Sequence, residues 1–429
     1  MKLVEQHIIK SNHKFYKELD TLCFLSKNLY NTALYEVRQF YFSSKDDPNV
    51  KYKYLNYYDV DRLLKERNDL NYRSLPIQAS QQILKLVDQN FKSFFNLLKK
   101  KKANLYSEKV KIPRYLDSEN GRQVVTFTTA CLSIKELKQG FIKPYRTNIK
   151  LKTKQDPKSI KQVRFIPRNN YIVMEVVYEV KEQIKKSNNG KYLSIDLGIN
   201  NLVTCVNSET LESFIVNGKP VKSINQYYNK EKSRLQSATE KSQKRKTSKN
   251  LNKLTLKRNN KIKNYFHKAS KYIVNQAVNN SLNSIVIGLN KEWKQDTNIG
   301  KKNNQNFVNI PHSTLISQIV YKAAMKGIKV YLQEESYTSK ASACDLDVVP
   351  EFGKLPIDWK PSGTRIKRGL FETKNGTLLN ADVNGSLNIL RKFLLKNDKE
   401  TNEKFERTLF ERTLVGRGSA TDPAKICLR

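Results

Sequence analysis

Residues 191–200 read Lys-Tyr-Leu-Ser-Ile-Asp-Leu-Gly-Ile-Asn, an apolar run in which Asp196 stands just before the glycine and asparagine that end a strand. Residues 378–391 read Leu-Leu-Asn-Ala-Asp-Val-Asn-Gly-Ser-Leu-Asn-Ile-Leu-Arg, and Asp382 opens a segment whose apolar residues recur at helical spacing. Carboxylates on a rigid strand and at a helix N-terminus can be brought together to bind Mg²⁺, the metal of phosphodiester chemistry. The two segments therefore predict one metal site.

The charge of the chain indicates its partner. Lysine and arginine outnumber aspartate and glutamate by 79 to 40 among 429 residues, which gives a formal net charge of +39. Hydrophobic residues make up 38%, enough to argue against general disorder and for two or three domains with substantial cores. Basic residues are spread over most of the chain, and no amphipathic basic helix stands alone, so nucleic acid is favoured over a membrane surface.

Other partners and cofactors are less favoured by the sequence. The first residues contain no signal-type apolar run, and no stretch approaches the roughly 18 apolar residues of a membrane span, so we expect a cytoplasmic protein. The five cysteines are scattered and form no Cys-x-x-Cys pair, and the four histidines are dispersed. We therefore expect neither disulfides nor a bound zinc ion.

Hydrophobic periodicity divides the chain into expected elements. In order, these are a strand at 1–10, helices within 14–102, β-rich sequence at 109–181, a strand pair at 193–195 and 202–206, basic helices at 227–271, a buried strand at 284–288, a helix at 313–326, a strand at 328–333, a loop-rich insertion at 345–376, a charged helical stretch at 391–412 and a tail. The strand pair is the start expected of an RNase H-like sheet.

The segment 227–271 is dense in lysine and arginine and is most simply a pair of long basic helices. A solvated charged face is the alternative, but with few acids to balance the charge, phosphate contact is favoured. Tyr115 could stack on bases or could belong to a core. The residues expected to contact nucleic acid are Lys111, Arg114, Tyr115, Lys244, Arg245, Lys246, Lys257, Arg258, Lys261 and Lys340.

Four motifs in order carry a family resemblance: Ser-Ile-Asp196-Leu-Gly-Ile-Asn, Ile-Val-Ile-Gly288, Tyr337-Thr-Ser-Lys340 and Asn-Ala-Asp382-Val-Asn-Gly-Ser-Leu-Asn-Ile. Together they resemble the TnpB (OrfB) family of transposon-encoded RNA-guided nucleases, which is related to compact type V CRISPR effectors. Shorter stretches at 80–84, 91–95, 111–115 and 264–271 fit the same family. Each motif alone is weak, but their order and spacing make the resemblance specific.

The resemblance implies an α+β multidomain fold. An N-terminal wedge-like β-barrel would be interrupted by a helical recognition lobe and followed by a split RuvC-like (RNase H-like) α/β nuclease domain with a loop-rich insertion. The implied bounds are 1–13 and 103–186 for the barrel, 14–102 for the lobe, 187–336 and 377–395 for the nuclease domain with its basic helical part at 227–271, 337–376 for a degenerate zinc-ribbon-like target-binding insertion, and 396–429 for a C-terminal tail.

The resemblance also implies an activity. In this family, a guide RNA derived from the insertion-sequence-type transposon pairs with target DNA beside a short flanking motif. A RuvC-type centre then cuts the DNA with two Mg²⁺ ions, for which Mn²⁺ can substitute, held by an Asp–Glu–Asp set. Asp196 matches the first acid of that set and Asp382 the third. Whether the active unit is a monomer or a dimer stays open.

This sequence departs from the family pattern at two places. The second acid usually ends the strand that here reads Ile-Val-Ile-Gly288, and glycine has no side chain to bind a metal. The zinc-ribbon cysteines are also missing: Cys344 stands alone, and Asp345 and Asp347 are not soft thiolate substitutes. We therefore expect the insertion to keep its outline without zinc.

A third carboxylate should lie near two metal ions that would otherwise be poorly balanced in charge. Glu334 and Glu335 follow the strand at 328–333, which neighbours the strand of Gly288 in an RNase H-like sheet. We favour Glu335 as the relocated second acid, because Glu334 shares the phase of the apolar strand residues. Glu334 is the alternative, and Glu292, in a Lys-rich loop, is a weaker third candidate.

Simpler roles exist for each of these residues. Asp382 could be only a helix cap, Asp196 could only shape a turn, and the glutamate pair could be a solvated strand end. Asn384 could align Asp382, contact phosphate or be a polar residue of the first helical turn. Two other functions stay open: a nuclease-inactive RNA-guided DNA-binding protein or repressor, and a guide-free transposase-like DNA-binding protein.

Overall fold

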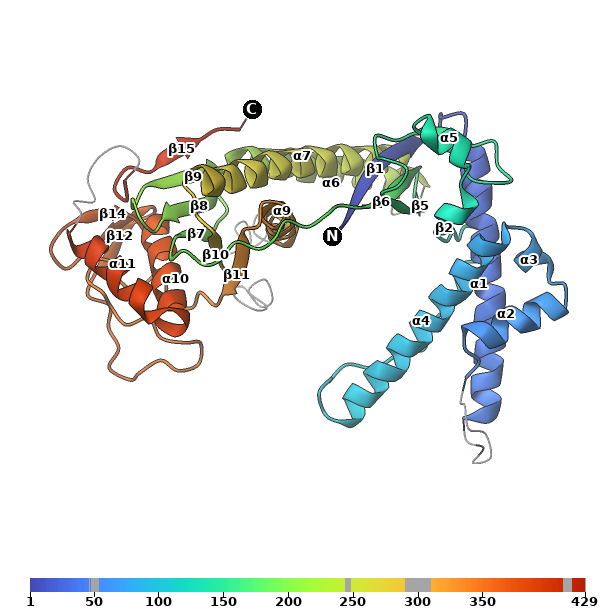
Figure 1. Ribbon diagram of the computed structural model, residues 1–429, viewed down its shortest axis with the longest axis horizontal. Helices are drawn as coiled ribbons and strands as arrows, with labels where there is room; N and C mark the ends of the chain where they lie inside the picture. Colours follow the sequence, from blue (N-terminus) through green and yellow to red (C-terminus); the bar gives the residue numbers. More distant parts are fainter. Residues whose placement is uncertain (46, 48–53, 244–247, 290–309, 412–418, 429) are drawn as a thin grey trace. The chain divides into compact units, whose positions relative to one another are not determined.

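The computed structural model divides into two compact units, Met1–Lys181 and Glu182–Arg429. It describes every residue of the chain except 46, 48–53, 244–247, 290–309, 412–418 and 429 (Figure 1). None of the described helices combines the length and the apolar character that crossing a membrane requires.

The first unit contains an antiparallel sheet in the order β1-β6-β5-β2. Its strands are β1 (Lys2–Lys10), β2 (Val125–Thr128), β5 (Ile160–Arg168) and β6 (Tyr171–Glu179), and a separate pair is formed by β3 (Phe141–Ile142) and β4 (Leu151–Lys152). Both β1 and β2 are edges, so the described residues form an open sheet where a closed barrel was expected. Closure would need hydrogen bonds between the edge strands, and β2 has only four residues.

The helices of the first unit lie within residues 14–102, as helical periodicity predicted, except for two short ones that interrupt the stretch 109–181 predicted to be β-rich. They are α1 (Tyr16–Ser44), α2 (Tyr57–Glu66), α3 (Leu70–Arg73) and α4 (Ile77–Lys102), followed by the short η1 (Thr129–Cys131) and α5 (Ile134–Lys138). Helix α1 joins two cores, because Leu19 and Cys23 pack with the sheet whereas Leu29 and Leu34 pack among the helices.

The second unit is built on a six-stranded sheet in the order β11-β10-β7-β8-β9-β15. The strands are β7 (Tyr192–Leu197), β8 (Asn201–Asn207), β9 (Ser213–Asn217), β10 (Ser284–Gly288), β11 (Lys329–Gln333) and β15 (Ala424–Ile426). Strands β7, β10 and β11 are mutually parallel, whereas β8 runs antiparallel to β7 and β9. Strand β15 lies within residues 396–429, for which a C-terminal tail was predicted, and it extends the sheet by pairing in parallel with β9.

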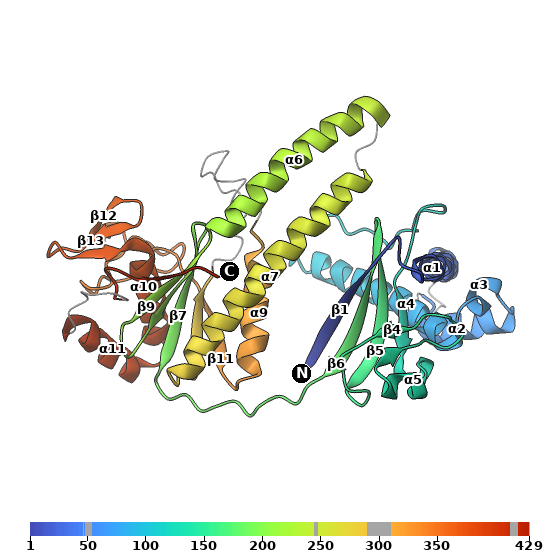
Figure 2. The ribbon, with the colours of Figure 1, turned by 90° about the horizontal axis from the view of Figure 1, so that it is seen from above.

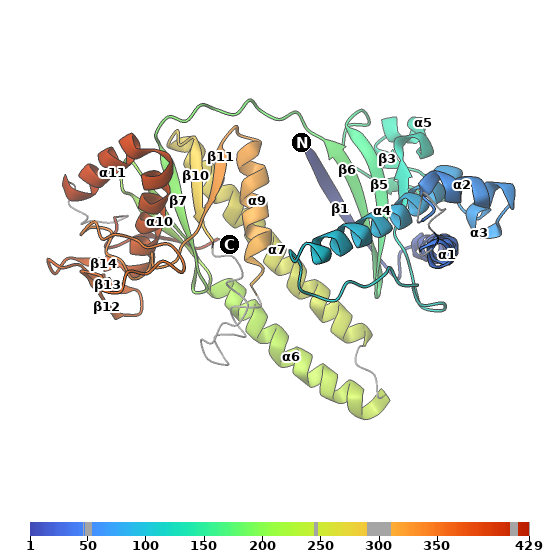
Figure 3. The same ribbon diagram turned by 90° about the horizontal axis from the view of Figure 1, so that it is seen from below.

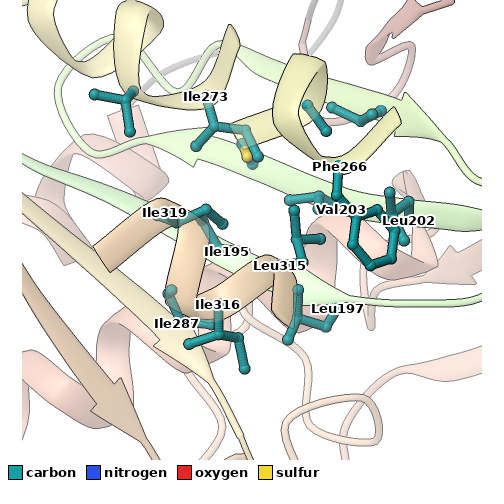
Figure 4. Close-up of a cluster of buried hydrophobic side chains, with 14 of the residues drawn as sticks. Ile195, Leu197, Leu202, Val203, Phe266, Ile273, Ile287, Leu315, Ile316 and Ile319 are labelled. Carbon is teal, nitrogen blue, oxygen red and sulfur yellow. The ribbon is translucent and has the colours of Figure 1, made fainter. Parts of the chain in front are cut away.

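Helices cover both faces of this sheet. On one face lie α7 (Lys249–Asn279) and α9 (His312–Ala324), which bury Ile195, Ile287 and Ile319 in one apolar cluster (Figure 4). On the other face lies α10 (Ala381–Asn397), with α11 (Lys399–Glu411) packed beside it (Figure 1). Because side chains alternate along a strand, the β7 residues that do not face α7 and α9 are directed to α10. Asp196 is one of them.

Two further features surround this core. Helix α6 (Lys219–Gln243) returns along α7 as a long antiparallel hairpin (Figure 2), and α9 lies against α7 and β11 (Figure 3). Strands β12 (Thr364–Lys367) and β13 (Leu370–Glu372) of the expected loop-rich insertion form a small antiparallel sheet with β14 (Leu378–Asn380), which follows the insertion. Because β14 ends where α10 begins, this sheet leads directly to Asp382.

Candidate active site

Three parallel strands bring two of the expected acids to one edge of the sheet. Gly288, the last residue of β10, pairs with Gln333, the last residue of β11. Asp196 is the next-to-last residue of the neighbouring β7, and Glu335 follows Gln333 by two residues. Because the carboxyl ends of parallel strands meet at the same edge, Asp196 and Glu335 converge beside Gly288.

Asp196 faces the first turns of α10 at very close range. A Cβ atom added to Gly385 would stand 3.0 Å from Oδ2 of Asp196. Ser194 lies two residues before Asp196 on β7, and Ser386 follows Gly385 on α10. The buried hydroxyls of these two serines are 2.7 Å apart and hydrogen-bonded. Small residues on both elements therefore let the helix approach β7 until its backbone lies against the carboxylate.

Glu335 occupies the space that a side chain at position 288 would need. A Cβ atom on Gly288 would stand 2.5 Å from Oε2 of Glu335 and 2.4 Å from Cδ1 of Ile389. Such distances are far below van der Waals contact, so a side chain at position 288 would require the ends of the Glu335 and Ile389 side chains to move. An acid delivered from the end of β11 thus lies where the strand of Gly288 lacks one.

Glu334 has a different role from its neighbour. Its carboxylate accepts a hydrogen bond from Lys392 Nζ at 2.6 Å and one from the Ser336 backbone N–H at 2.6 Å. Partial burial favours a higher pKa for Glu334, but the hydrogen bonds from Lys392 and Ser336 outweigh it and lower the pKa. Lys392 also donates to the Ser336 and Pro350 carbonyls. Glu334 therefore holds the segment after β11 against α10.

Asp382 lies in the first turn of α10 but does not cap it. The side chain of Asn380 accepts the capping hydrogen bonds from the backbone N–H groups of Asp382 and Val383, at 3.0 and 3.3 Å. The Asp382 carboxylate instead accepts a hydrogen bond from Asn201 Nδ2 at 2.7 Å. Arg365, on β12, places Nη2 3.7 Å from the other carboxylate oxygen. Asp382 is therefore oriented by one neutral donor and one cation.

The electrostatics show that these acids share one environment. Burial raises the pKa of Asp196 well above its usual value, the Glu335 and Asp382 carboxylates raise it further, and Arg365 opposes them. Burial, and to a smaller extent the charge of Glu334, raises the pKa of Glu335 to about 7. Three acids with one partly opposing arginine form a region that a divalent cation would stabilise.

The oxygen donors fit Mg²⁺ chemically, although the described residues contain no group of three or more His, Cys, Asp or Glu side chains arranged as a finished metal site. Mg²⁺ usually binds through one or two carboxylates together with water and substrate phosphates, and dedicated protein cages are uncommon for it. A complete cage in the protein alone is therefore not required for Asp196, Glu335 and Asp382 to be ligands.

Helix α10 also anchors the insertion, through residues whose role the sequence did not reveal. Asn384, fully buried, accepts from the Ala343 N–H and donates to the Ala341 carbonyl, at 2.9 and 2.8 Å. Asn388, also fully buried, donates to the Thr338 and Ala341 carbonyls. Asn384 thus holds backbone of the insertion and does not align Asp382.

Two aspartates organise the expected insertion at residues 337–376. Asp347 accepts hydrogen bonds from the backbone N–H groups of Ser342 and Ser362, at 2.7 and 3.0 Å. Asp345 accepts from the Ser362 hydroxyl and the Lys374 N–H, at 3.1 and 2.9 Å. These carboxylates tie together segments that are distant in sequence. Cys344 packs against the apolar cluster under α10.

The expected nucleic-acid contacts are distributed over several surfaces. Lys111 and Arg114 are exposed, and Tyr115 is 44% exposed with the Arg38 guanidinium 4.9 Å from its ring centroid. Lys257 and Lys261 are exposed on α7, Arg258 is half-buried there, and Lys340 is exposed beside the insertion. Residues Lys244, Arg245 and Lys246, and the weaker acid candidate Glu292, lie outside the described residues.

Comparisons with known proteins agree with the sequence motifs. Residues 175–294 match the OrfB_IS605 family, described as a probable transposase, and residues 312–389 match the Cas12f1-like TNB domain. A search of curated proteins found no match.

Solved structures with similarity to the chain include a Cas12f1–sgRNA–target DNA complex, with 14% identity, a TM-score of 0.33 and coverage of 92% of this chain and 100% of that one. The mini-RNA-guided endonuclease CRISPR-Cas_phi3 shows 11% identity, a TM-score of 0.43 and coverage of 91% and 92%. The two matched regions contain all four motifs that carry the resemblance, at Asp196, Gly288, Tyr337–Lys340 and Asp382, and the family resemblance of these motifs is thereby confirmed.

Proposed function

We propose that this protein is an RNA-guided DNA endonuclease of an insertion-sequence-type transposon, hydrolysing DNA phosphodiesters at Asp196, Glu335 and Asp382. The observation that carries the proposal is the position of Glu335. Its carboxylate fills the space that a side chain at Gly288, on β10, would need. Asp196 lies against α10 and Asp382 at the start of that helix, and the carboxylates of Glu335 and Asp382 both raise the pKa of Asp196.

The residues around the three acids would have different roles in catalysis. Asp196, Glu335 and Asp382 would hold two Mg²⁺ ions, with Mn²⁺ as a substitute. When bound, these ions supply an activated water and stabilise charge on the phosphate. Asn201 fixes the orientation of Asp382, and Lys392 fixes the segment that carries Glu335 through its bond to Glu334. The Arg365 side chain is 46% exposed, so its guanidinium could turn from the Asp382 carboxylate to a substrate phosphate.

Guide RNA and target DNA are the proposed partners. A net charge of +39 supports extensive phosphate contact. Sequence specificity would come from base pairing with the guide, while the protein would read a short flanking motif and the backbone of the heteroduplex. The strand order of the second unit, with three antiparallel strands followed by two parallel ones on the other side of β7, supports an RNase H-like arrangement.

A nuclease-inactive RNA-guided DNA-binding protein is the second candidate. It is favoured by Gly288, which stands where the family's second acid is expected. Mutually repelling buried carboxylates are costly to keep, however, and a protein that only binds DNA has no chemical use for them. A guide-free transposase-like DNA-binding protein is the third reading, and the same experiment separates all three.

The test is to express the protein with its own flanking DNA, sequence the RNA that co-purifies, and incubate the complex with a matched plasmid and Mg²⁺. We expect cleavage that needs the RNA, the matched sequence and Mg²⁺, and that is lost in Asp196→Ala. RNA-directed binding without cleavage in the wild type would establish the repressor reading instead. DNA binding that does not depend on RNA would establish the guide-free reading.

A further inference from the structure

Helices α6 and α7 enclose a cavity that is separate from the acids. Its volume is about 310 Å³. The residues that matter for its chemistry are Ile224, Tyr227 and Tyr228 on α6, and Lys257, Arg258 and Lys261 on α7. This volume is at the lower end of ligand pockets, which suits a single small unit and not a helix of nucleic acid.

All charged side chains that line the cavity are cations. Among the residues that the structure describes, no carboxylate lines the cavity, and neither Lys257 nor Lys261 takes part in an ion pair. Both lysines are exposed, so they can turn toward an anion at the mouth. The lining therefore favours a ligand that carries negative charge, such as a phosphate group.

Arg258 is held in place inside this basic lining. Its Nε donates to Asn225 Oδ1 at 2.8 Å, and Asn225 is only 1% exposed. The guanidinium also lies 5.4 Å from the centroid of the Tyr228 ring, whose hydroxyl is hydrogen-bonded to Thr255. A guanidinium fixed on an aromatic ring and an amide loses little further freedom when a planar ligand arrives.

Tyr227 supplies an aromatic surface at the same cavity. Its side chain is 61% exposed, although its neighbours Ile224 and Leu254 are apolar and could have covered it. Exposed aromatic rings among cations are the usual platform on which unpaired bases stack. The cavity thus combines a surface for a base with charges for the adjoining phosphate.

We propose that the cavity between α6 and α7 binds one unstacked nucleotide, with its base on Tyr227 and its phosphate at Lys257 and Lys261. The inference rests on the proposed function, because the nucleotide belongs to the guide RNA or to the DNA that the complex binds. One nucleotide turned out of a helix at this point would fix the register of the strand on the basic hairpin.

The test uses the full-length protein in its RNA complex with Mg²⁺ withheld. 5-Iodouridine in the guide RNA and 5-iododeoxyuridine in the target DNA are the photocrosslinking probes, and mass spectrometry identifies the crosslinked residue. We expect a crosslink at Tyr227 from one of the two strands, which also identifies the source of the nucleotide. Crosslinks to the protein that avoid residues 223–261 in both arms would overturn the proposal.

Affinity measurements on oligouridine and oligothymidine supply the matched controls. Tyr227→Ala should weaken binding of one of them roughly tenfold, since stacking of a base contributes about 1–3 kcal/mol. Tyr227→Phe should keep the affinity, and Lys253→Ala, an exposed lysine of α7 outside the cavity, should change it less than about threefold. Equal affinity in wild type and Tyr227→Ala would contradict the proposal that a base stacks on Tyr227 in this cavity.

Failure of this proposal can be distinguished from failure of the nuclease. If the complex crosslinks through Tyr227 but does not cut DNA, the proposed nuclease activity is overturned, whereas the proposed nucleotide binding in the cavity stands. If instead the complex cuts DNA and Tyr227→Ala binds both oligonucleotides as tightly as wild type, the nucleotide-binding cavity is overturned and the nuclease stands.

Discussion

Gly288 and Glu335 lie in close contact, because Oε2 of the carboxylate is 2.5 Å from the position that a β-carbon on residue 288 would take. Gly288→Ala should therefore displace Glu335 and abolish cleavage, even though alanine is an ordinary strand residue. Ile389→Val is the matched control, since it removes only the Cδ1 atom that would also meet the new methyl group. Cleavage assays should find Ile389→Val active, and Gly288→Ala with Ile389→Val still inactive. Cleavage by that double variant at the wild-type rate would show that Glu335 is not needed at this position.

The acids should also make the metal-free protein less stable as the pH rises. The pKa of Glu335 is raised from its usual 4.5 to about 7, so the folded protein binds more protons than the unfolded chain between these values. Stability then falls as pH rises through this window, by about 1–3 kcal/mol for this group. Urea unfolding at pH 5 and pH 8 measures the loss, which Glu335→Gln should reduce.

Glu334→Gln is the control for that experiment. Because the pKa of Glu334 is lowered in the folded state, its contribution to stability is present above its usual pKa and is lost as the pH falls. Because burial is the larger cause of the raised pKa of Glu335 and the charge of Glu334 the smaller one, Glu334→Gln should keep most of the fall in stability between pH 5 and pH 8 and reduce it less than Glu335→Gln does. A pH dependence that is the same in wild type and Glu335→Gln would contradict the assignment.

At the level of single residues, Asp196 and Asp382 were predicted because each stands at the end or the start of an apolar element, and Glu335 because the family resemblance implied an acid that Gly288 cannot supply. The sequence could not predict Asn201, Arg365 or Gly385. These residues lie near the acids only because β8, β12 and α10 are brought together by the fold. Asn201 and Arg365 belong to no periodic pattern or local motif that would have marked them, and Gly385 stands in the Asp382 motif without any sign there that it faces Asp196.

Helix α10 is the element that couples the site to the insertion. Its N-terminus carries Asp382, and Asn388 on the following turns bonds to the Thr338 and Ala341 carbonyls. Asn388→Ala should lower the free energy of unfolding by about 1–3 kcal/mol, since it removes the Asn388 donor from the buried Thr338 carbonyl and the Asn388 acceptor from the Arg391 guanidinium. Hydrogen exchange at residues 338–343 should increase as well.

The exposed Asn397→Ala, also on α10, is the control for Asn388. Its amide bonds only to the Phe393 carbonyl of the same helix, so its loss should change stability by less than about 0.5 kcal/mol. Similar effects of the two substitutions would show that the insertion is not anchored through Asn388.

Among the elements, long periodic segments were predictable and short ones were not. Helices α1, α4 and α7 carry enough apolar repeats to be read from the sequence, and the β7 and β10 strands are continuous apolar runs. Strand β15 has three residues, Ala-Lys-Ile, and its existence depends on β9 as a partner. Likewise, whether the first sheet closes depends on its edge strands, which no local pattern specifies.

The whole molecule is dominated by its positive charge. A net charge of +39 should make nucleic-acid binding strongly dependent on salt. If 6–10 phosphates are contacted, the affinity should fall by roughly a thousandfold or more between 50 and 200 mM salt. Filter binding of the RNA complex over this range measures the slope. A nearly flat slope would contradict a binding mode based on phosphate contacts.

The central claim is that Glu335, and not Glu334, is the second acid of a nuclease. The most direct measurement compares cleavage of matched target DNA by RNA complexes of wild type, Glu335→Gln and Glu334→Gln in Mg²⁺. We predict that Glu335→Gln lowers the cleavage rate by about a hundredfold or more, whereas Glu334→Gln stays within about threefold of wild type. Wild-type cleavage by Glu335→Gln, or its loss only in Glu334→Gln, would contradict the account.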